Sequence, residues 1–242
     1  MDYNIEQGIL ELKKGLKILN IELEEYQIKQ FMDYYQILVE WNNKMNLTSI
    51  TELKEVIHKH FLDSLSIVEV YRPIYEKIID VGTGAGFPGI PIKIAFPNTK
   101  VVLMDSLKKR IGFLEEVIKE LNLCNIEVIH ARAEDLGRDE SFRESFDLCT
   151  SRAVAKLSVL TEYCLPFVKK GGYFIPYKSG NINEELQEAQ NAIKILGGTV
   201  KDHKEFILPL TDIGRSMIMI EKIKETPKKY PRTAGKPSKE PL

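Results

Sequence analysis

The N-terminal part of the chain has apolar residues at helical spacing. Between Glu24 and Trp41 charged side chains alternate with the apolar set Ile28, Phe31, Tyr35 and Leu38. A stripe of this period predicts an amphipathic helix. Polar turn formers interrupt it in WNNKMNLTS, and residues 49–52 then have the sequence of a capping box ahead of a second helix. We therefore expect the first seventy residues to be helical throughout.

The pattern changes after residue 73, where short β-rich runs alternate with helical stretches. We expect strands at KIIDVG, KVVLMD, IEVIH, FDLCTS and GGYFIPYK, and helices over 89–95, 107–122, 155–168 and 182–196. Strands that alternate with helices favour a parallel sheet covered on both faces. The last two runs, TVKDHKEFILPL and SMIMIEKI, have only the turn TDIGR between them and predict an antiparallel hairpin added to the sheet.

Five alternating units that end in a hairpin predict an α/β fold of the class I S-adenosylmethionine-dependent methyltransferase type. This is a Rossmann-like, seven-stranded sheet with an antiparallel last hairpin, whereas a dinucleotide fold would repeat two similar halves. We divide the chain into a helical extension packed on the core (1–72), a methyltransferase domain (73–225) and a basic, proline-rich C-terminal tail (226–242). The low apolar content of the tail favours a loosely packed or disordered arm.

Composition excludes several classes of protein. The 242 residues are 43% hydrophobic, enough for a sizeable core, and 34 Lys and Arg nearly balance 35 Asp and Glu. Net charge therefore predicts no particular partner, and such evidence has to come from local clusters. Three cysteines without CxxC spacing argue against disulfides and structural zinc. Without an apolar signal core or a membrane-spanning stretch, we expect a cytoplasmic monomer with no membrane or metal partner.

The first predicted strand is followed by four glycines in eight residues, in IIDVGTGAGFPG. A strand that ends in glycines and enters a helix offers backbone N–H groups, a positive helix end and no Cβ atoms, which suits a nucleotide-like cofactor. The register Gly82-x-Gly84-x-Gly86 is the one associated with S-adenosylmethionine. The string over 84–89 also matches the GxGxxG of dinucleotide proteins, but it starts several residues after the strand. Tight packing without a ligand is a third interpretation.

Polar side chains also stand at the ends of the other predicted strands. Asp105 ends the second strand, where its carboxylate can accept hydrogen bonds from both ribose hydroxyls of an adenosine or can instead cap the following helix. The third, fourth and fifth strands are followed by His130–Glu134, Thr150–Ala153 and Lys178–Gly180. Because ligands of open parallel sheets bind at the carboxyl ends of strands, we expect these groups to face one crevice.

Taken together, the motifs resemble a known family over nearly the whole chain. The chain is similar to the bacterial small-subunit ribosomal RNA methyltransferase G family, also called glucose-inhibited division protein B, in WNNKMNLTSI, KHFLDSLS, DVGTGAGFPGIPIKI, DSLKKRIGFL, HARAED, TSRAVA, GGYFIPYK and TPKKYPRTAGKPSKEPL. The resemblance implies an enzyme that transfers a methyl group from S-adenosylmethionine to guanine N7 in the 530 loop of 16S ribosomal RNA. The implied partner is that RNA or the small ribosomal subunit.

The resemblance also implies which residues bind the cofactor. They are Gly82, Phe87, Asp105, Ser106, Leu107, Ala133, Glu134 and Arg152, to which the glycine pattern adds Gly84 and Gly86. Glu134 suits the exocyclic amine of adenine as an acceptor, and Phe87 can cover the cofactor with its ring. Arg152 follows the fourth strand, where either the methionine carboxylate or the guanine can be its partner.

The implied reaction needs alignment rather than a general base, because guanine N7 has an unprotonated lone pair. The candidate catalytic residues are Arg152 and Lys178, either of which can donate to guanine O6. His58 and His60 are expected to be packed or surface residues, since no carboxylate lies at metal-ligand spacing.

Other functions stay open at this stage. The tail cations are candidate contacts to RNA phosphates, and they are Lys228, Lys229, Arg232, Lys236 and Lys239. A ribosome-assembly factor that binds the cofactor without turnover is one alternative. A nicotinamide-dependent oxidoreductase is another, but it would need two repeated halves and an acid or base at the hydride site.

Overall fold

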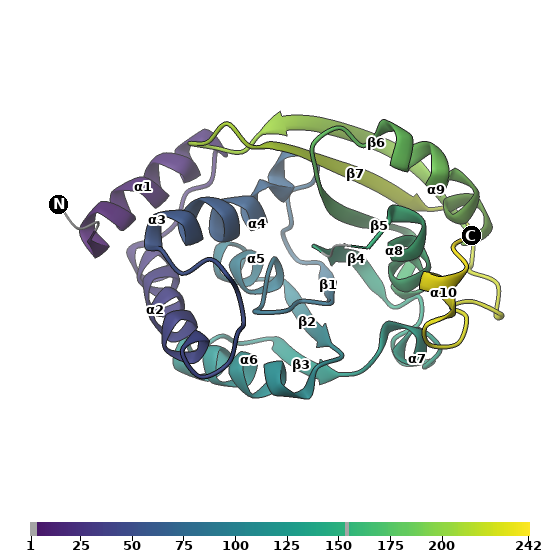
Figure 1. The fold of residues 1–242 in the computed structure, drawn as a ribbon, viewed down its shortest axis with the longest axis horizontal. Coiled ribbons are helices and arrows are strands. Elements are labelled where there is room, and N and C mark those ends of the chain that lie inside the picture. Colours follow the sequence, from purple (N-terminus) through teal and green to yellow (C-terminus); the bar gives the residue numbers. More distant parts are fainter. Residues whose placement is uncertain (1–3, 153–154) are drawn as a thin grey trace.

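The fold is a single mixed sheet with helices on both faces (Figure 1). The computed structural model describes residues 4–152 and 155–242, so Ala153 and Val154 of the TSRAVA motif lie outside the described residues. The strand order is β3-β2-β1-β4-β5-β7-β6. The strands are β1 (Lys77–Val81), β2 (Lys100–Asp105), β3 (Ile126–His130), β4 (Phe146–Ser151), β5 (Val168–Ser179), β6 (Gly198–Ile207) and β7 (Gly214–Lys222).

Strands β1 to β5 are parallel, and β7 pairs antiparallel with both β5 and β6. The predicted α/β fold with an antiparallel last hairpin is therefore confirmed. β5 begins at Val168, three residues before the run that predicted it, because its first residue pairs with Phe146 across an irregularity in the β4 ladder. The carboxyl ends of β1 to β5 all meet at one edge of the sheet.

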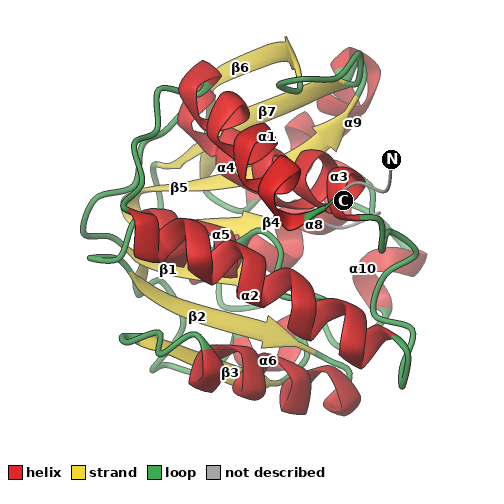
Figure 2. Ribbon diagram, turned by 90° about the vertical axis from the view of Figure 1, so that its left-hand side faces the viewer, coloured by secondary structure: helices red, strands yellow, loops and turns green. Residues whose placement is uncertain are grey.

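One face of the sheet is covered by the N-terminal helices together with α5 and α6, and Figure 2 shows α1, α2 and α5 in front of the strands. These helices are α1 (Ile5–Ile18), α2 (Glu25–Asn42), α3 (Leu53–Val56), α4 (Asp63–Leu65), α5 (Gly89–Ala95) and α6 (Lys108–Glu120). One hydrophobic cluster runs from Leu12 and Phe31 through Ile78 to Met217. The N-terminal helices thus bury their apolar stripes on the core of the sheet, and the division proposed at residue 72 stays a prediction.

The opposite face is covered by α7 (Ala133–Leu136), α8 (Leu157–Cys164) and α9 (Asn183–Ile195), and α10 (Lys236–Lys239) lies beside α7 and α8 (Figure 1). A 3-10 turn, Leu165–Phe167, completes the stretch predicted as one helix over 155–168. A second hydrophobic cluster on this face includes Phe146, Leu160, Ile193 and Tyr230. The C-terminal segment therefore contributes to the core through Tyr230.

The C-terminal segment, residues 226–242, is packed against the protein, and the expectation of a loosely packed arm is wrong. Thr226 and Tyr230 are 4% and 6% exposed. The Arg143 guanidinium donates to the carbonyls of Thr226 and Tyr230, at 2.6 Å and 2.9 Å. Composition is misleading because backbone hydrogen bonds and one ion pair, neither of which requires apolar residues, add to the burial of Tyr230 in fixing the segment.

The capping box predicted over 49–52 is not formed. α3 begins at Leu53 with Glu52 as its N-cap residue and without a side-chain capping hydrogen bond, while the Thr48 hydroxyl accepts from the Ile50 N–H. The chain continues as a π-helical turn, Ile57–Leu62, ahead of α4 and a 3-10 turn, Ser66–Glu69. π-Helical turns occur frequently at functional sites.

Two further features of the described residues bear on the expectations. None of their helices combines the length and hydrophobicity that crossing a bilayer requires, and no group of three His, Cys, Asp or Glu side chains among them is placed to hold a metal ion. The three cysteines are free thiols, of which Cys149 and Cys164 are buried and Cys124 is exposed.

Candidate functional site

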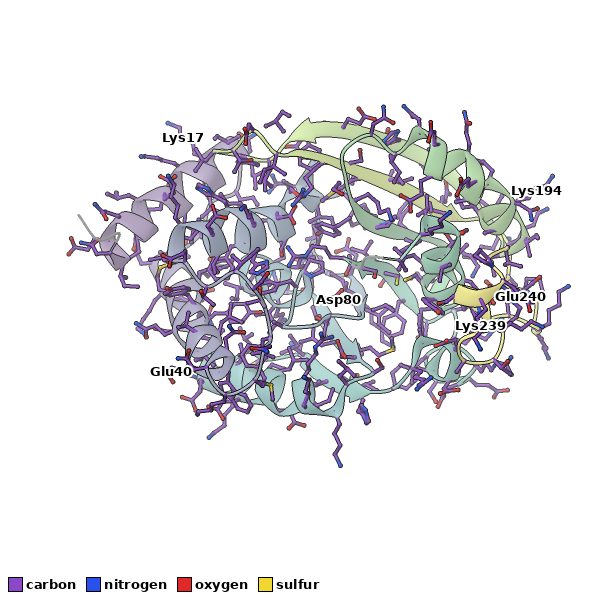
Figure 3. All side chains as sticks on the ribbon, in the orientation of Figure 1. Lys17, Glu40, Asp80, Lys194, Lys239 and Glu240 are labelled. Carbon is purple, nitrogen blue, oxygen red and sulfur yellow. The ribbon has the colours of Figure 1, made fainter. Side chains whose placement is uncertain are left out.

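The glycine turn between β1 and α5 is held by Asp80, which is fully buried near the centre of the molecule (Figure 3). Its carboxylate accepts hydrogen bonds from the Thr83 hydroxyl at 2.6 Å, the Gly89 N–H at 2.9 Å and the Thr150 hydroxyl at 3.3 Å. Burial raises the pKa of Asp80 to about 6, and these hydrogen bonds limit the rise. Sequence reasoning passed over Asp80, although a lone acid in an apolar strand is an unusual signal.

The glycines of the turn have two different roles. Gly82 and Gly84 have φ angles of +71° and +62°, and no heavy atom lies within 4 Å of where a Cβ would stand. At Gly86 a Cβ would lie 2.7 Å from the Tyr34 hydroxyl oxygen, so this glycine permits close packing instead. Tyr34 on α2 also donates its hydroxyl to the Ala85 carbonyl, which ties the turn to an N-terminal helix. Tight packing is therefore confirmed at Gly86, while cofactor binding at Gly82 and Gly84 stays a prediction.

Three adjoining cavities follow the edge where the strands end. The α7 cavity, of about 440 Å³, is lined by Gly82, Ser106, Ala133, Glu134, Tyr163 and Gly235 among others. The turn cavity, of about 290 Å³, is lined by residues that include Thr48, His60, Gly82, Gly84, Phe87 and Arg152. The cationic cavity, of about 430 Å³, is lined by Ile50, Lys59, His60, Asp63, Arg152, Tyr177, Lys178, Ser179, Glu185 and Arg215. Neighbouring cavities share Gly82 on one side and His60 with Arg152 on the other, which makes one crevice.

Asp105 lies beneath this crevice and is 2% exposed. One carboxylate oxygen accepts from the Gly84 N–H at 2.9 Å and from Arg110 at 3.0 Å, and the other accepts from the Leu107 N–H at 2.8 Å. Asp105 thus fastens the glycine turn to the start of α6, where Leu107 is the N-cap residue. Neither Asp105 nor Leu107 lines the three cavities as described, so their contacts with a cofactor stay predictions.

Arg152 lies where the turn and cationic cavities meet and is held by the N-terminal helices. Its guanidinium donates to Asp63 and to the Lys59 carbonyl, both at 3.0 Å, and approaches His60 Nδ1 at 3.1 Å. Asp63 also accepts from Arg215 on β7 at 2.7 Å. Asp63 therefore bridges two arginines that follow it in the chain by 89 and 152 positions.

Asp63 and His60 are site residues that sequence reasoning did not assign. Their segment, KHFLDSLS, carried part of the family resemblance, which is the one signal that could have pointed to them. Of the two expected placements, packed or at the surface, His60 has the packed one, since this residue is 8% exposed. Its place in the crevice was missed because its partner Arg152 lies 92 positions further along the chain.

The His60 ring stacks on Phe87, with 4.4 Å between ring centroids and 17° between planes. Burial and the nearby Arg152 charge lower the pKa of His60 to about 3, so the imidazole is neutral at neutral pH. Because a guanidinium has no acceptor, Nδ1 accepts from Arg152 and Nε2 donates to the Thr48 hydroxyl oxygen at 3.0 Å. Because His60 is neutral, Arg152 is the charged partner of Asp63 here. Its guanidinium carbon lies over the Phe87 ring, 5.1 Å from the ring centroid.

The buried neutral His60 predicts a specific acid sensitivity. Its folded-state pKa is depressed below the usual 6.5, so the unfolded chain takes up this proton first and stability is lost as pH falls from 6.5 towards 3. Between pH 7 and pH 4.5, His60→Gln should lose about 2–3 kcal/mol less of its unfolding free energy than the unaltered protein. Denaturant unfolding at both pH values measures this, with His130→Gln, an exposed site, as control. Equal losses of unfolding free energy in all three proteins would contradict a lowered pKa of His60.

Lys178, the other candidate catalytic residue, lines the cationic cavity at the end of β5. Its ammonium group donates to the Ala155 carbonyl at 3.0 Å and pairs with Glu185 at 2.6 Å. Glu185 also accepts from the Leu157 N–H at 2.6 Å and so fixes the start of α8. Lys178 and Arg152 thus line the same cavity.

Solved structures of low sequence identity share this fold. The chain resembles TYW2 of Pyrococcus horikoshii, solved in complex with MeSAdo, with a TM-score of 0.53 at 14% identity over 67% of this chain and 62% of that one. It also resembles the ribosomal protein L11 methylase of Lactobacillus delbrueckii subsp. bulgaricus, with a TM-score of 0.50 at 19% identity over 67% and 77% of the two chains. At these identities the likeness concerns the fold alone.

Sequence comparison is much closer. The chain is 56% identical over 230 residues to the ribosomal RNA small subunit methyltransferase G of Lachnoclostridium phytofermentans, covering 95% of both chains. It is 53% identical to the protein of the same name from Acetivibrio thermocellus, over 98% of this chain and 100% of that one. Residues 27–211 match the family described as rRNA small subunit methyltransferase G. The chain therefore belongs to the rRNA small subunit methyltransferase G family.

Proposed function

We propose that the protein transfers a methyl group from S-adenosylmethionine to N7 of a guanine in the 530 loop of 16S ribosomal RNA, in the cytoplasm. The observation that carries this proposal is the crevice, which joins a glycine cradle and a largely apolar cavity to a cavity rich in cations. A nucleoside-like donor suits the first part, and an anionic polymer that presents a purine suits the second.

The residues of the α7 and turn cavities fit S-adenosylmethionine. The open Cβ positions at Gly82 and Gly84 leave room for a ligand against the backbone, and the Glu134 carboxylate supplies an acceptor for an amino group. When bound, the cofactor supplies a sulfonium-activated methyl group. Ser106 and Ala133 complete the proposed adenosine side, while Arg152 closes the turn cavity at its other end.

The cationic cavity fits the target nucleotide. Arg152, Lys178 and Arg215 bring positive charge to it, and Asp63 with Glu185 keeps these side chains in fixed positions. A donor at guanine O6 aligns the base without touching the lone pair of N7. No proton has to leave N7 before it is methylated, so a neutral His60 and the lack of an assigned base are compatible with the reaction.

Replacing Asp105 tests the cofactor side. Asp105→Ala should weaken binding of S-adenosylhomocysteine by about 1–3 kcal/mol, because the Gly84 N–H loses its acceptor and the ribose hydroxyls lose theirs. Isothermal calorimetry measures the loss, and a 2′-deoxyribose analogue should lose less than the parent compound. Unchanged affinity in a folded variant would leave Asp105 with its structural role at the start of α6 alone.

Methyl incorporation tests the whole proposal. The protein is incubated with labelled S-adenosylmethionine and either small subunits or protein-free 16S RNA, and the modified nucleotide is mapped. We expect label at one guanine N7. Cofactor binding without incorporation would favour an assembly factor, and binding of NADH in place of S-adenosylhomocysteine would favour an oxidoreductase. Size-exclusion chromatography of the same sample checks the predicted monomer.

A further inference from the structure

We infer that the C-terminal segment, residues 226–242, is the outer wall of the α7 cavity and positions Glu134 there, instead of serving as an RNA-binding arm. Gly235 lines this cavity, and its N–H donates to Glu134 Oε1 at 2.9 Å. Figure 1 shows α10 beside α7 and α8. The inference rests on the proposed function in one respect, since it takes the adenosine of the cofactor to occupy this cavity.

The segment is fastened first to the region of α7, the helix that carries Ala133 and Glu134. Arg138, two residues past α7, donates to the Pro231 carbonyl at 2.9 Å. A Cβ at Gly137 would lie 3.1 Å from the Pro231 ring, so the two segments touch closely at this point. These contacts fix the entry of the segment relative to one wall of the cavity.

The second attachment is to α8, which forms the opposite wall. Glu162 is fully buried and accepts from the Arg232 side chain at 2.9 Å and 2.6 Å, and from the Arg232 N–H at 2.8 Å. Further along, the hydroxyl groups of Tyr163 and Ser238 are hydrogen-bonded at 2.8 Å. Because Tyr163 itself lines the cavity, the segment bridges α7 and α8 across it.

This bridge determines how Glu134 presents its carboxylate. Glu134 is 8% exposed, and its Oε1 accepts a hydrogen bond from the Gly235 N–H. A backbone donor to one oxygen fixes the orientation of the carboxylate. The second oxygen is then held as an acceptor for an amino group of the ligand, such as the exocyclic amine of adenine.

The same contacts leave less of the segment for RNA than its composition indicated. Arg232 is committed to Glu162. Lys228, Lys229, Lys236 and Lys239 are exposed. Surface lysines can still add to a general attraction for RNA, but the ordered contacts of the segment are directed at the cofactor side of the protein.

The test is a truncation that keeps the ion pair between Arg232 and Glu162. Deleting residues 235–242 retains Arg232 with Glu162 and removes Gly235, α10 and the partner of Tyr163. We expect the dissociation constant for S-adenosylhomocysteine to rise at least tenfold, and selectivity against S-inosylhomocysteine, which has an oxygen in place of the amine, to fall with it. Lys228→Ala combined with Lys229→Ala is the matched control and should leave this affinity unchanged.

A double-mutant cycle separates positioning from bulk stability. If the segment acts through Glu134, the truncation should add little to the affinity loss already caused by Glu134→Gln. Gly235→Ala in the full-length protein is the second variant, since φ is +80° and a Cβ there meets open space. The strained backbone should turn the N–H away from Glu134 and weaken binding severalfold without unfolding the protein.

The outcomes are distinct. Equal affinity for S-adenosylhomocysteine in the full-length protein, the truncation and Gly235→Ala would overturn the inference while leaving the proposed function intact. A truncation that keeps full cofactor affinity but flattens the salt dependence of RNA binding by about one unit or more would restore the RNA-arm interpretation. Failure of the full-length protein to bind S-adenosylhomocysteine would count against the proposed function itself. If the truncated protein melts early, the affinity of the full-length Gly235→Ala variant decides whether the inference holds, since unchanged affinity there overturns it.

Discussion

Replacing Arg152 by alanine should lower kcat for methyl transfer by about 10²-fold or more, with a smaller effect on S-adenosylhomocysteine binding. A displacement of about 1 Å in aligned reactants can cost 10²-fold, and this reaction depends on alignment. Arg152 fixes the wall between the turn and cationic cavities through Asp63, His60 and the Lys59 carbonyl. The fold should persist, because Asp63 keeps its hydrogen bond from Arg215.

Two comparisons make the Arg152 result specific. Arg152→Lys keeps the charge but not the planar fork that reaches Asp63 and His60 together, so it should restore little of the rate. Lys194→Ala, at the periphery in Figure 3, should behave as the unaltered protein. If Arg152→Ala instead loses cofactor affinity first, its ligand is the methionine carboxylate. Lys178 would then be the one remaining candidate donor to guanine O6 of the two proposed from the sequence.

The fold was predictable because its signals are local. Alternation of β-rich runs with amphipathic stretches placed β1 to β4 and the hairpin within a few residues of their observed bounds. The glycine turn was predictable for the same reason, since strand, turn and helix are consecutive there. The parallel topology alone indicated that the residues at the strand ends meet at one edge of the sheet. The structure agrees, because one crevice is lined by Gly82, Ser106, Glu134, Arg152 and Lys178.

The remaining part of the site depends on partners that are distant in the sequence. In the sequence pattern His60 and Asp63 are simply polar positions of an N-terminal helix. Only folding brings them to Arg152. The π-helical turn over 57–62 also changes which side chains share a face, so a 3.6-residue period misplaces this segment. Asp80 is a further residue whose role the sequence did not reveal. Hydropathy counts the burial of a carboxylate as unfavourable, but three hydrogen bonds compensate the cost of burying this one.

The C-terminal segment shows the same limit of composition. Residues 226–242 are poor in apolar side chains, which favours disorder when each residue is counted separately. Their carbonyls nevertheless accept hydrogen bonds from Arg138 and Arg143, and Arg232 forms an ion pair with a buried carboxylate. Hydrogen bonds and a buried charge pair supply order here that the number of apolar residues cannot indicate.

That buried pair gives the largest stability effect we expect. Arg232→Ala leaves Glu162, which is fully buried, without its guanidinium partner. Breaking such a pair from one side costs about 3–5 kcal/mol, because among the described residues the remaining carboxylate is buried without an opposite charge and keeps only the backbone N–H of residue 232 as a donor. For a chain of this length each kcal/mol lowers Tm by roughly 2–4 °C, so thermal unfolding should begin on the order of 10 °C lower.

Removing both charges should be less harmful than removing one. Glu162→Gln combined with Arg232→Ala eliminates the unpaired carboxylate and should recover part of the lost stability, as a double-mutant cycle would show. Lys236→Ala is the matched control in the same segment, since its contact with Glu240 is long and exposed and should contribute almost nothing. If Arg232→Ala melted at the same temperature as Lys236→Ala, Glu162 would have to be solvated in solution. The C-terminal segment would then be detached from α8, and the α7 cavity would lack its proposed outer wall.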